Sequence, residues 1–136
     1  MNDRGSITLW VLGLTIMVLF LGGIALDLWR AFEIREDLAA MADSAATAGA
    51  SQVDGATYRD TGVLELDAAA AVAVANTNLD TQQDRERITN RTMRARGAVL
   101  TVRLEGEVSF TLLRVFLGGG SVAVSATGSA EALPAP

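Results

Sequence analysis

The side chains that most often perform catalysis are missing from this chain of 136 residues. It has no histidine, cysteine or lysine, and all eleven basic residues are arginine. This composition excludes Ser–His, Cys–His and Ser–Lys nucleophile systems, disulfides and thiolate metal sites. Carboxylate chemistry is left, but Glu105 and Glu107 are predicted to share the solvent face of one strand, where nothing nearby would separate their pKa values. We therefore expect a protein that is not an enzyme.

A second group of residues carries the oxygen ligands that calcium prefers. Its members are Asn76, Asn78, Asp80 and Asp84. Their spacing matches no EF-hand loop, so we favour a plain surface connection over a Ca²⁺ site. The triple glycine at residues 118–120 lacks the Lys and the Ser or Thr of a phosphate-binding loop. We expect no metal, no cofactor and no small-molecule substrate.

Arginines gather in residues 85–96. Five of the eleven lie there: Arg85, Arg87, Arg91, Arg94 and Arg96. Such a stretch could contact lipid headgroups, an acidic partner or nucleic acid. The formal net charge of −5 and the lack of aromatic residues between these arginines argue against nucleic acid. We favour a solvated strand face balanced by nearby acids.

The element that positions the rest of the chain is an uncharged run at residues 6–26. Its only polar side chains are Ser6, Thr8 and Thr15. As a helix, about 20 residues rising roughly 1.5 Å each match the roughly 30 Å hydrocarbon core of a bilayer. A buried core helix would normally be shorter and have a polar face. A signal peptide would have a positive N-terminal region and a cleavage site of small residues. The pattern predicts a retained membrane helix.

Two pairs of residues mark this helix. Trp10 and Trp29 bracket it, which suits aromatic anchors at the two membrane surfaces or packing on a partner. Gly22 and Gly23 are either a hinge or a close contact for another membrane helix. The arginines near the two ends are almost balanced, so charge alone gives no orientation.

The helix is predicted to continue beyond Asp27 as one rod from about residue 7 to residue 50. Residues 28–52 contain no proline and are rich in good helix formers. Residues at spacings of three and four define one face of this extension. That face holds Leu28, Ala31, Arg35, Leu38, Ala42, Ala45 and Gly49. Its small side chains would let the protein's own sheet approach closely, and we expect packing against the domain or another subunit there.

The rest of the chain predicts a small α+β domain. Residues 52–62 are interpreted as a loop, residues 63–75 as a second, Ala-rich helix and residues 77–87 as a surface connection. Strict alternation of apolar and polar residues predicts strands at residues 98–110 and 121–131, with a weaker candidate at 87–96 and one or two helical turns at 111–117. A sheet of about three antiparallel strands needs a helix against its apolar face. The two Ala-rich helices are the available covers.

Three segments carry a family resemblance. They are Arg4-Gly5-Ser6 before the apolar run, GIALDL at residues 23–28 and DLAAMADSAATAGA at residues 37–50. They resemble the TadE/TadG-like family of minor pilins or pilin-like assembly proteins of the tight-adherence (Flp, type IVc) pilus. The resemblance covers residues 4–50 well and residues 99–132 loosely, and it implies a pilin-like fold.

Two features depart from the family pattern. In TadE-like pseudopilins a prepilin peptidase cuts after a glycine, and a glutamate stands fifth in the mature chain. Here Gly5 and Ser6 offer the cleavage position, but the fifth residue after Gly5 is Trp10, which argues against processing and points to a TadG-like, retained protein. Longer TadG proteins carry a von Willebrand-type adhesion domain; we expect none here, because the 136 residues leave no room for it and contain no Asp-x-Ser-x-Ser motif.

The resemblance implies a membrane-anchored minor pilin or pilin-like subunit of a Tad pilus. The alternative is a membrane-tethered accessory module of an envelope secretion system that never enters a filament. The expected partners are the lipid bilayer and other pilus subunits or Tad assembly proteins, with no nucleic acid. We expect a single-pass protein with a segment at residues 1–5, a span at 6–26, a helix extension at 27–51 and an exported domain at 52–136.

Overall fold

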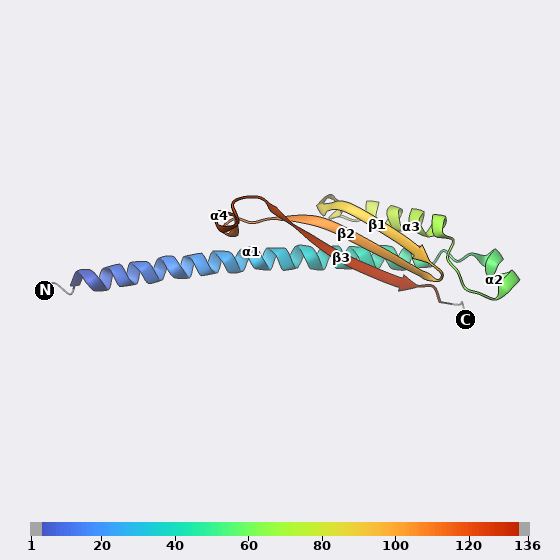
Figure 1. The fold of residues 1–136 in the computed structure, drawn as a ribbon, viewed down its shortest axis with the longest axis horizontal. Coiled ribbons are helices and arrows are strands. Elements are labelled where there is room, and N and C mark those ends of the chain that lie inside the picture. Colours follow the sequence, from blue (N-terminus) through green and yellow to red (C-terminus); the bar gives the residue numbers. More distant parts are fainter. Residues whose placement is uncertain (1–3, 134–136) are drawn as a thin grey trace.

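The computed structural model describes residues 4–133, with the side chains of residues 4–6 and 116–117 left out. Residues 1–3 of the predicted N-terminal segment, and the tail from residue 134, lie outside the described part. The elements in chain order are α1 (Arg4–Ala50), α2 (Gly55–Thr61), α3 (Ala68–Asp80), the short η1 (Arg85–Arg87), β1 (Ile88–Arg96), β2 (Val99–Ser109), α4 (Leu113–Leu117) and β3 (Ser121–Glu131). The predicted α+β class, with a long N-terminal helix and a three-stranded antiparallel sheet, is confirmed (Figure 1).

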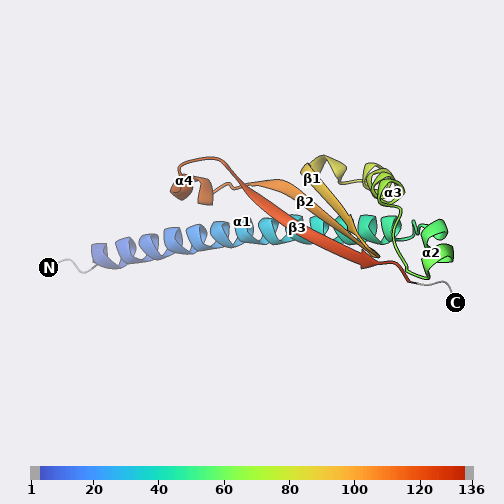
Figure 2. The ribbon, with the colours of Figure 1, turned by 45° about the vertical axis from the view of Figure 1, so that its right-hand side comes forward.

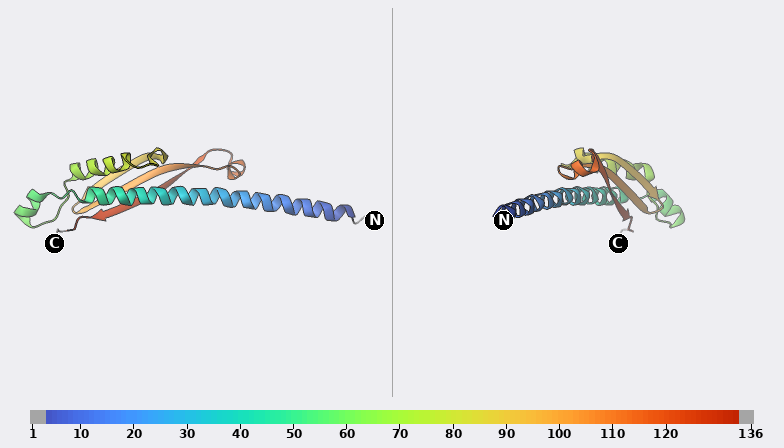
Figure 3. Two further views of the ribbon diagram at one scale, coloured as in Figure 1. Left: turned by 180° about the vertical axis from the view of Figure 1, so that it is seen from behind. Right: turned by 60° about the vertical axis from the view of Figure 1, so that its left-hand side comes forward.

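The long helix α1 is unbroken over 47 residues, as the sequence predicts. At 1.5 Å per residue it is about 70 Å long. Gly22 and Gly23 do not interrupt it, because a glycine inside a helix costs only about 1 kcal/mol relative to alanine. Only its C-terminal part carries the sheet and the other helices, while its N-terminal part extends alone (Figure 3).

The three strands pair in the order β1-β2-β3. Strand β2 is central, with Met93 opposite Val102 on one side and Leu104 opposite Ala126 on the other. The predicted alternation along β2 is confirmed. Its core-facing residues are all buried: Leu100, Val102, Leu104, Gly106 and Val108. Residues between them face away from the core and are exposed or partly exposed.

The core lies where the sheet crosses the C-terminal half of α1, with α3 beside it (Figure 2). From α1 it takes Leu38, Met41, Ala42, Ala45 and Ala46. The small residues are needed because the backbones approach closely. A Cβ at Gly128 of β3 would lie 2.5 Å from the backbone carbonyl carbon of Ala42 and 2.5 Å from the Asp43 nitrogen.

The structure corrects the prediction for residues 52–87. Residues 52–62 contain helix α2, whose N-terminus is capped by Asp54. The Ala-rich helix begins after Asp67, not at residue 63, and extends to Asp80, so the surface connection begins later than predicted. The Asp67 carboxylate accepts hydrogen bonds from the backbone amides of Ala69 and Ala70. Capping by these two aspartates, rather than apolar composition, sets where each helix begins.

Candidate membrane and assembly surface

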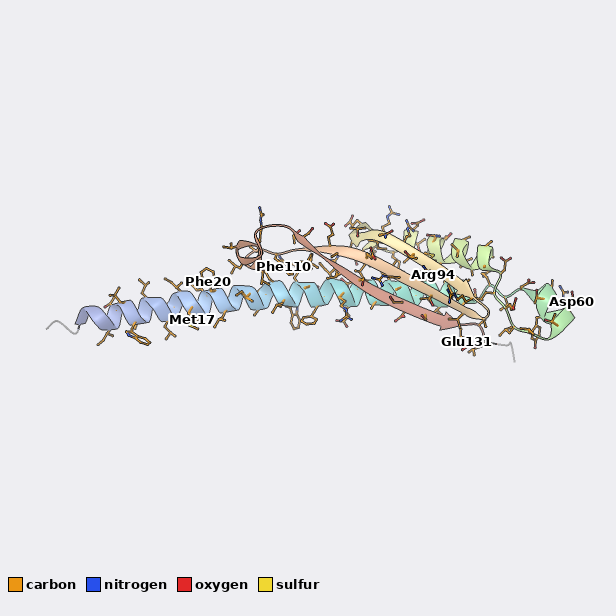
Figure 4. The ribbon with its side chains drawn as sticks, viewed as in Figure 1. Met17, Phe20, Asp60, Arg94, Phe110 and Glu131 are labelled. Carbon is orange, nitrogen blue, oxygen red and sulfur yellow. The ribbon has the colours of Figure 1, made fainter. Side chains whose placement is uncertain are left out.

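Among the described residues, nothing covers the N-terminal half of α1. Every residue from 7 to 22 is exposed, and Figure 4 shows side chains on all sides of this segment, with Met17 and Phe20 labelled. The Thr15 hydroxyl donates to the Val11 carbonyl at 2.8 Å, so its polar group is satisfied within the helix. The helix is long and apolar enough to cross a membrane by length and composition. A bare apolar surface of this size requires lipid or other helices around it.

Both tryptophans lie on exposed surface of α1, as anchors or packing residues must. Trp10 is 77% exposed and Trp29 is 73% exposed. Their separation along the helix is about 28 Å at 1.5 Å per residue, close to the thickness of a hydrocarbon core. Phe32 is also exposed, one turn beyond Trp29.

The two glycines of α1 have different surroundings. A Cβ at Gly22 would meet nothing within 4 Å. A Cβ at Gly23 would collide with the side chain of Leu112, which comes from the connection between β2 and β3. Within this chain Gly23 is the contact point for Leu112, and the two predicted roles, a hinge or a contact with another membrane helix, stay predictions. The surface at Gly22 remains open.

Asp27 fastens this connection to α1. The residue is only 3% exposed. Its carboxylate accepts backbone hydrogen bonds from Thr111 at 3.0 Å, Leu112 at 2.7 Å and Leu113 at 2.9 Å. These are amides at the start of α4 that a short helix leaves unsatisfied, and Leu112 has no side-chain oxygen with which to cap them.

The same hydrogen bonds hold the pKa of the Asp27 carboxyl below its usual range. The Leu113 amide has the largest effect, followed by the Thr111 amide; burial acts in the opposite direction, and Leu112 and the charge of Arg30 add to the lowering. Asp27 is the first residue beyond the predicted span, and it stays ionised there although it is buried. Sequence reasoning took it only as the end of the apolar run. The sequence signal for this role is its spacing: Asp27 lies four residues after Gly23 and four before Ala31, so the three residues share one face of the helix.

We call residues 110–120 the tip. The tip joins β2 to β3, contains α4 and lies beside α1 near the end of the bare half (Figures 1 and 4). Gly118, Gly119 and Gly120 all have positive φ, which lets the chain reverse tightly after α4 and enter β3. Within the tip, Phe110 and Leu112 are partly buried, whereas Val115 is 71% exposed.

The predicted packing face of α1 is rotated slightly from the one observed. Leu38, Ala42 and Ala45 are buried, and a Cβ at Gly49 would collide with Leu100 and lie 2.6 Å from the Ala71 carbonyl oxygen. Leu28, by contrast, is 47% exposed and does not join the core. The reason is geometric: the seam runs through Gly23, Asp27, Ala31, Ile34 and Leu38, so Leu28 and Arg35 fall beside it. Packing of Leu28 against another subunit stays a prediction.

Gly5 and Ser6 belong to the first turns of α1, and only their backbone is described. The peptide bond between them therefore lies in a helix.

The oxygen-rich group at residues 76–84 is bonded to other side chains. Arg91 donates to Asp80 at 3.0 Å and to Asn76 at 3.2 Å. The Asn78 side-chain oxygen accepts from Gln82, and Asp84 pairs with Arg87. Among residues 4–133, no three acidic side chains come together in a way that could hold a metal ion.

The arginine-rich stretch divides into two parts. Arg85, Arg87 and Arg91 bind acids or backbone oxygens nearby, including the pair of Arg87 with Asp37 of α1. Arg94 (Figure 4) and Arg96 are both exposed on β1, and within the described residues neither has an ion-pair partner.

A long helix with a bare apolar half, and a small sheet packed on its other half, is a pilin-like fold. Residues 5–52 match the family described as "Putative Flp pilus-assembly TadE/G-like", which is the family that the sequence resembles. The matched segment coincides closely with α1, and the match supports a role in pilus assembly. No curated protein and no solved structure matches the chain significantly.

Proposed function

We propose that this protein is a single-pass membrane subunit of a Tad (Flp) pilus system, a minor pilin or pilin-like protein whose domain after α1 is exported. The observation that carries the proposal is the form of α1. One unbroken helix has a bare apolar first half and a second half that holds a folded domain, and the whole of it coincides with the match to the pilus-assembly family.

The proposed mechanism is assembly without catalysis. Burying one large aliphatic side chain contributes roughly 1.5–3 kcal/mol, so covering the bare half of α1 is strongly favourable. Lipid covers it while the subunit stays in the membrane. The apolar helices of other pilus subunits could cover the same surface in a filament, and Gly22 offers them a place for close approach.

One observation favours a second candidate, a membrane-tethered accessory module that stays out of the filament. Trp10 stands where a processed pseudopilin of this family would have glutamate. A subunit that is not cleaved after Gly5 would remain in the membrane beside the assembly machinery. Intact-mass measurement of the purified membrane protein tests this point: we expect no mass corresponding to a chain that begins at Ser6.

The two candidates are separated by locating the protein. Sheared and purified pili from the wild-type strain are probed for this chain, and pili are counted in a strain that lacks its gene. A minor pilin is found in the pilus fraction, or its loss changes pilus number. Absence from pili together with normal piliation in the deletion strain would contradict the first proposal.

A change in pilus number in the deletion strain would not by itself show that the helix spans a membrane. The second arm of the test is therefore protease treatment of intact spheroplasts. An exported domain is digested from outside, with cleavage at exposed arginines such as Arg94 and Arg96. Protection of the domain in intact spheroplasts, and digestion only after lysis, would overturn the proposed orientation.

A further inference from the structure

The tip is the part of the sheet domain nearest to the apolar half of α1. Leu112 sits on Gly23, and Asp27 holds the amides that follow. Gly23 lies six residues before Trp29, which is about 9 Å along the helix. If Trp29 marks the membrane surface, the tip lies at or below that level.

We propose that the tip is a second membrane contact, which rests on the outer leaflet of the bilayer beside α1. This inference depends on the proposed function, because it takes α1 to be the membrane span. The occupant we assign to the exposed side of the tip is lipid. The part of the acyl chains next to the headgroups contacts Val115, and lipid phosphate contacts Arg114.

The composition of the tip fits that occupant. Besides Val115, residues 110–120 contain five large apolar residues: Phe110, Leu112, Leu113, Phe116 and Leu117. They contain no acid and a single cation, Arg114. Arg114 is exposed, and within the described residues it has no carboxylate partner. An exposed apolar side chain, Val115, next to a cation without a carboxylate partner is complementary to the boundary between lipid chains and phosphates.

The backbone of the tip is also suited to such a place. An amide that enters the membrane boundary without a hydrogen bond is costly. Asp27 satisfies the amides of Thr111, Leu112 and Leu113, and the Gly119 amide donates to the Arg114 carbonyl at 3.0 Å. The same donors replace water around the buried Asp27 carboxylate and stabilise its negative charge.

The inference is tested with the full chain in vesicles of phosphatidylcholine and phosphatidylglycerol that contain no other protein. Because the chain has no cysteine, Val115→Cys gives a single labelling site for an environment-sensitive fluorophore. Two further variants serve as references: Leu14→Cys in the middle of the span, and Ser129→Cys on the exposed face of β3. Quenching by aqueous iodide and by lipids with nitroxides at the headgroup or deep in the chain is compared.

We expect the label at position 115 to be quenched by headgroup nitroxides and shielded from iodide, with its emission shifted to the blue relative to position 129. The label at position 14 should respond to deep nitroxides. If position 115 behaves like position 129 while position 14 is in lipid, the tip inference is overturned and the proposed span stands. If position 14 is itself open to iodide, the proposed span fails, and the tip inference fails with it.

A charge reversal tests the assignment of Arg114. Arg114→Glu should reduce quenching by headgroup nitroxides at position 115, because a carboxylate would be repelled by lipid phosphates. Arg96→Glu, at the opposite end of the sheet, makes the same change in net charge and should leave this quenching unchanged. An equal effect of the two substitutions would overturn the role of Arg114. Since no other protein is present, shielding in these vesicles also separates lipid from a partner subunit as the occupant.

Discussion

Asp27 connects two parts of the chain that are more than eighty residues apart in sequence. It provides negative charge to the first amides of α4, a position that favours an anion because these N–H groups have no partner within the helix. Burial would ordinarily disfavour an ionised carboxylate, but the three backbone donors compensate for the lost water. The same residue ends the apolar run and fixes the position of the tip.

Replacing Asp27 by asparagine should loosen the tip. The amide side chain is neutral and has one oxygen acceptor, so it cannot match a carboxylate that accepts from three amides. We expect faster hydrogen exchange at Thr111, Leu112 and Leu113 in Asp27→Asn, measured on the full chain in detergent micelles. Glu33→Gln, an exposed substitution on the same helix, is the control and should leave these rates unchanged. Unchanged protection in Asp27→Asn would contradict the role we assign to the carboxylate.

The pH dependence of the tip follows from the direction of the Asp27 pKa. Because the pKa in the folded state is lower than that of an unfolded aspartate, about 3.9, the ionised group stabilises the folded tip above that pH. This stability is lost as the pH falls below about 4 toward the folded-state pKa. We expect the Leu112 and Leu113 amide chemical shifts to titrate with a midpoint below about 3.9. A midpoint above this value would contradict the prediction.

Gly22 and Gly23 form a matched pair for a second test at the residue scale. Gly23→Ala places a methyl group where Leu112 now lies, so the Leu112 side chain must move and the tip should lose hydrogen-exchange protection. Gly22→Ala meets open space, and alanine is favoured over glycine in a helix by about 1 kcal/mol. Loss of tip protection in Gly22→Ala, or none in Gly23→Ala, would show that Leu112 is not seated on this glycine.

At the scale of elements, the fold depends on how closely α1 and β3 approach. Alanines and glycines on both sides bring the helix and strand backbones together, and the long alternating strand β2 supplies the bulky apolar residues that fill the core beside them. The closest approach is at Gly128, where the neighbouring atoms belong to the α1 backbone and cannot move aside as a side chain can.

Gly128→Ala should therefore destabilise the sheet domain by roughly 1–3 kcal/mol, the usual cost of overpacking a well-packed core. The free energy of unfolding can be measured by urea titration of the full chain in detergent micelles, followed by circular dichroism. The matched control is Ser129→Thr, which adds a methyl group to the next residue on the exposed face of the strand. A loss in the control as large as that in Gly128→Ala would show that strand geometry, rather than contact with α1, sets the cost.

At the scale of the whole molecule, the protein has two parts: the bare apolar N-terminal half of α1, and the sheet domain packed on its C-terminal half. A charge in the middle of the bare half should affect membrane retention and leave the fold of the sheet domain intact. An arginine at the centre of a membrane helix costs about 2.5–3.5 kcal/mol on insertion scales.

We accordingly expect Ile16→Arg to reduce the amount of protein retained in carbonate-washed membranes. Tyr58→Arg, an exposed substitution on α2, should have no effect. Hydrogen exchange of β2 reports whether each variant is folded. Full retention of a folded Ile16→Arg protein would contradict a membrane-spanning role for α1.

The sequence by itself determined the periodic parts of this protein. An uncharged run followed by good helix formers predicts α1 as one rod, and strict alternation predicts β2 and β3, because each pattern is local and repeats over many residues. The TadE/G-like segment was also identifiable, since its motifs lie along α1. The start of α3 was predicted too early, because apolar composition extends across the Asp67 cap that begins the helix.

Only the tertiary structure decided which face of α1 is covered and what Gly23 and Asp27 do. Their partners, Leu112 and the amides of the tip, are separated from them by almost the whole sheet domain, so no local pattern joins them. A rotation by one residue separates Leu28, which is exposed, from Asp27, which is buried, and helical spacing alone could not choose between these adjacent positions. The sheet determines which face of α1 is covered, because the connection between β2 and β3 contacts α1 at Gly23 and Asp27.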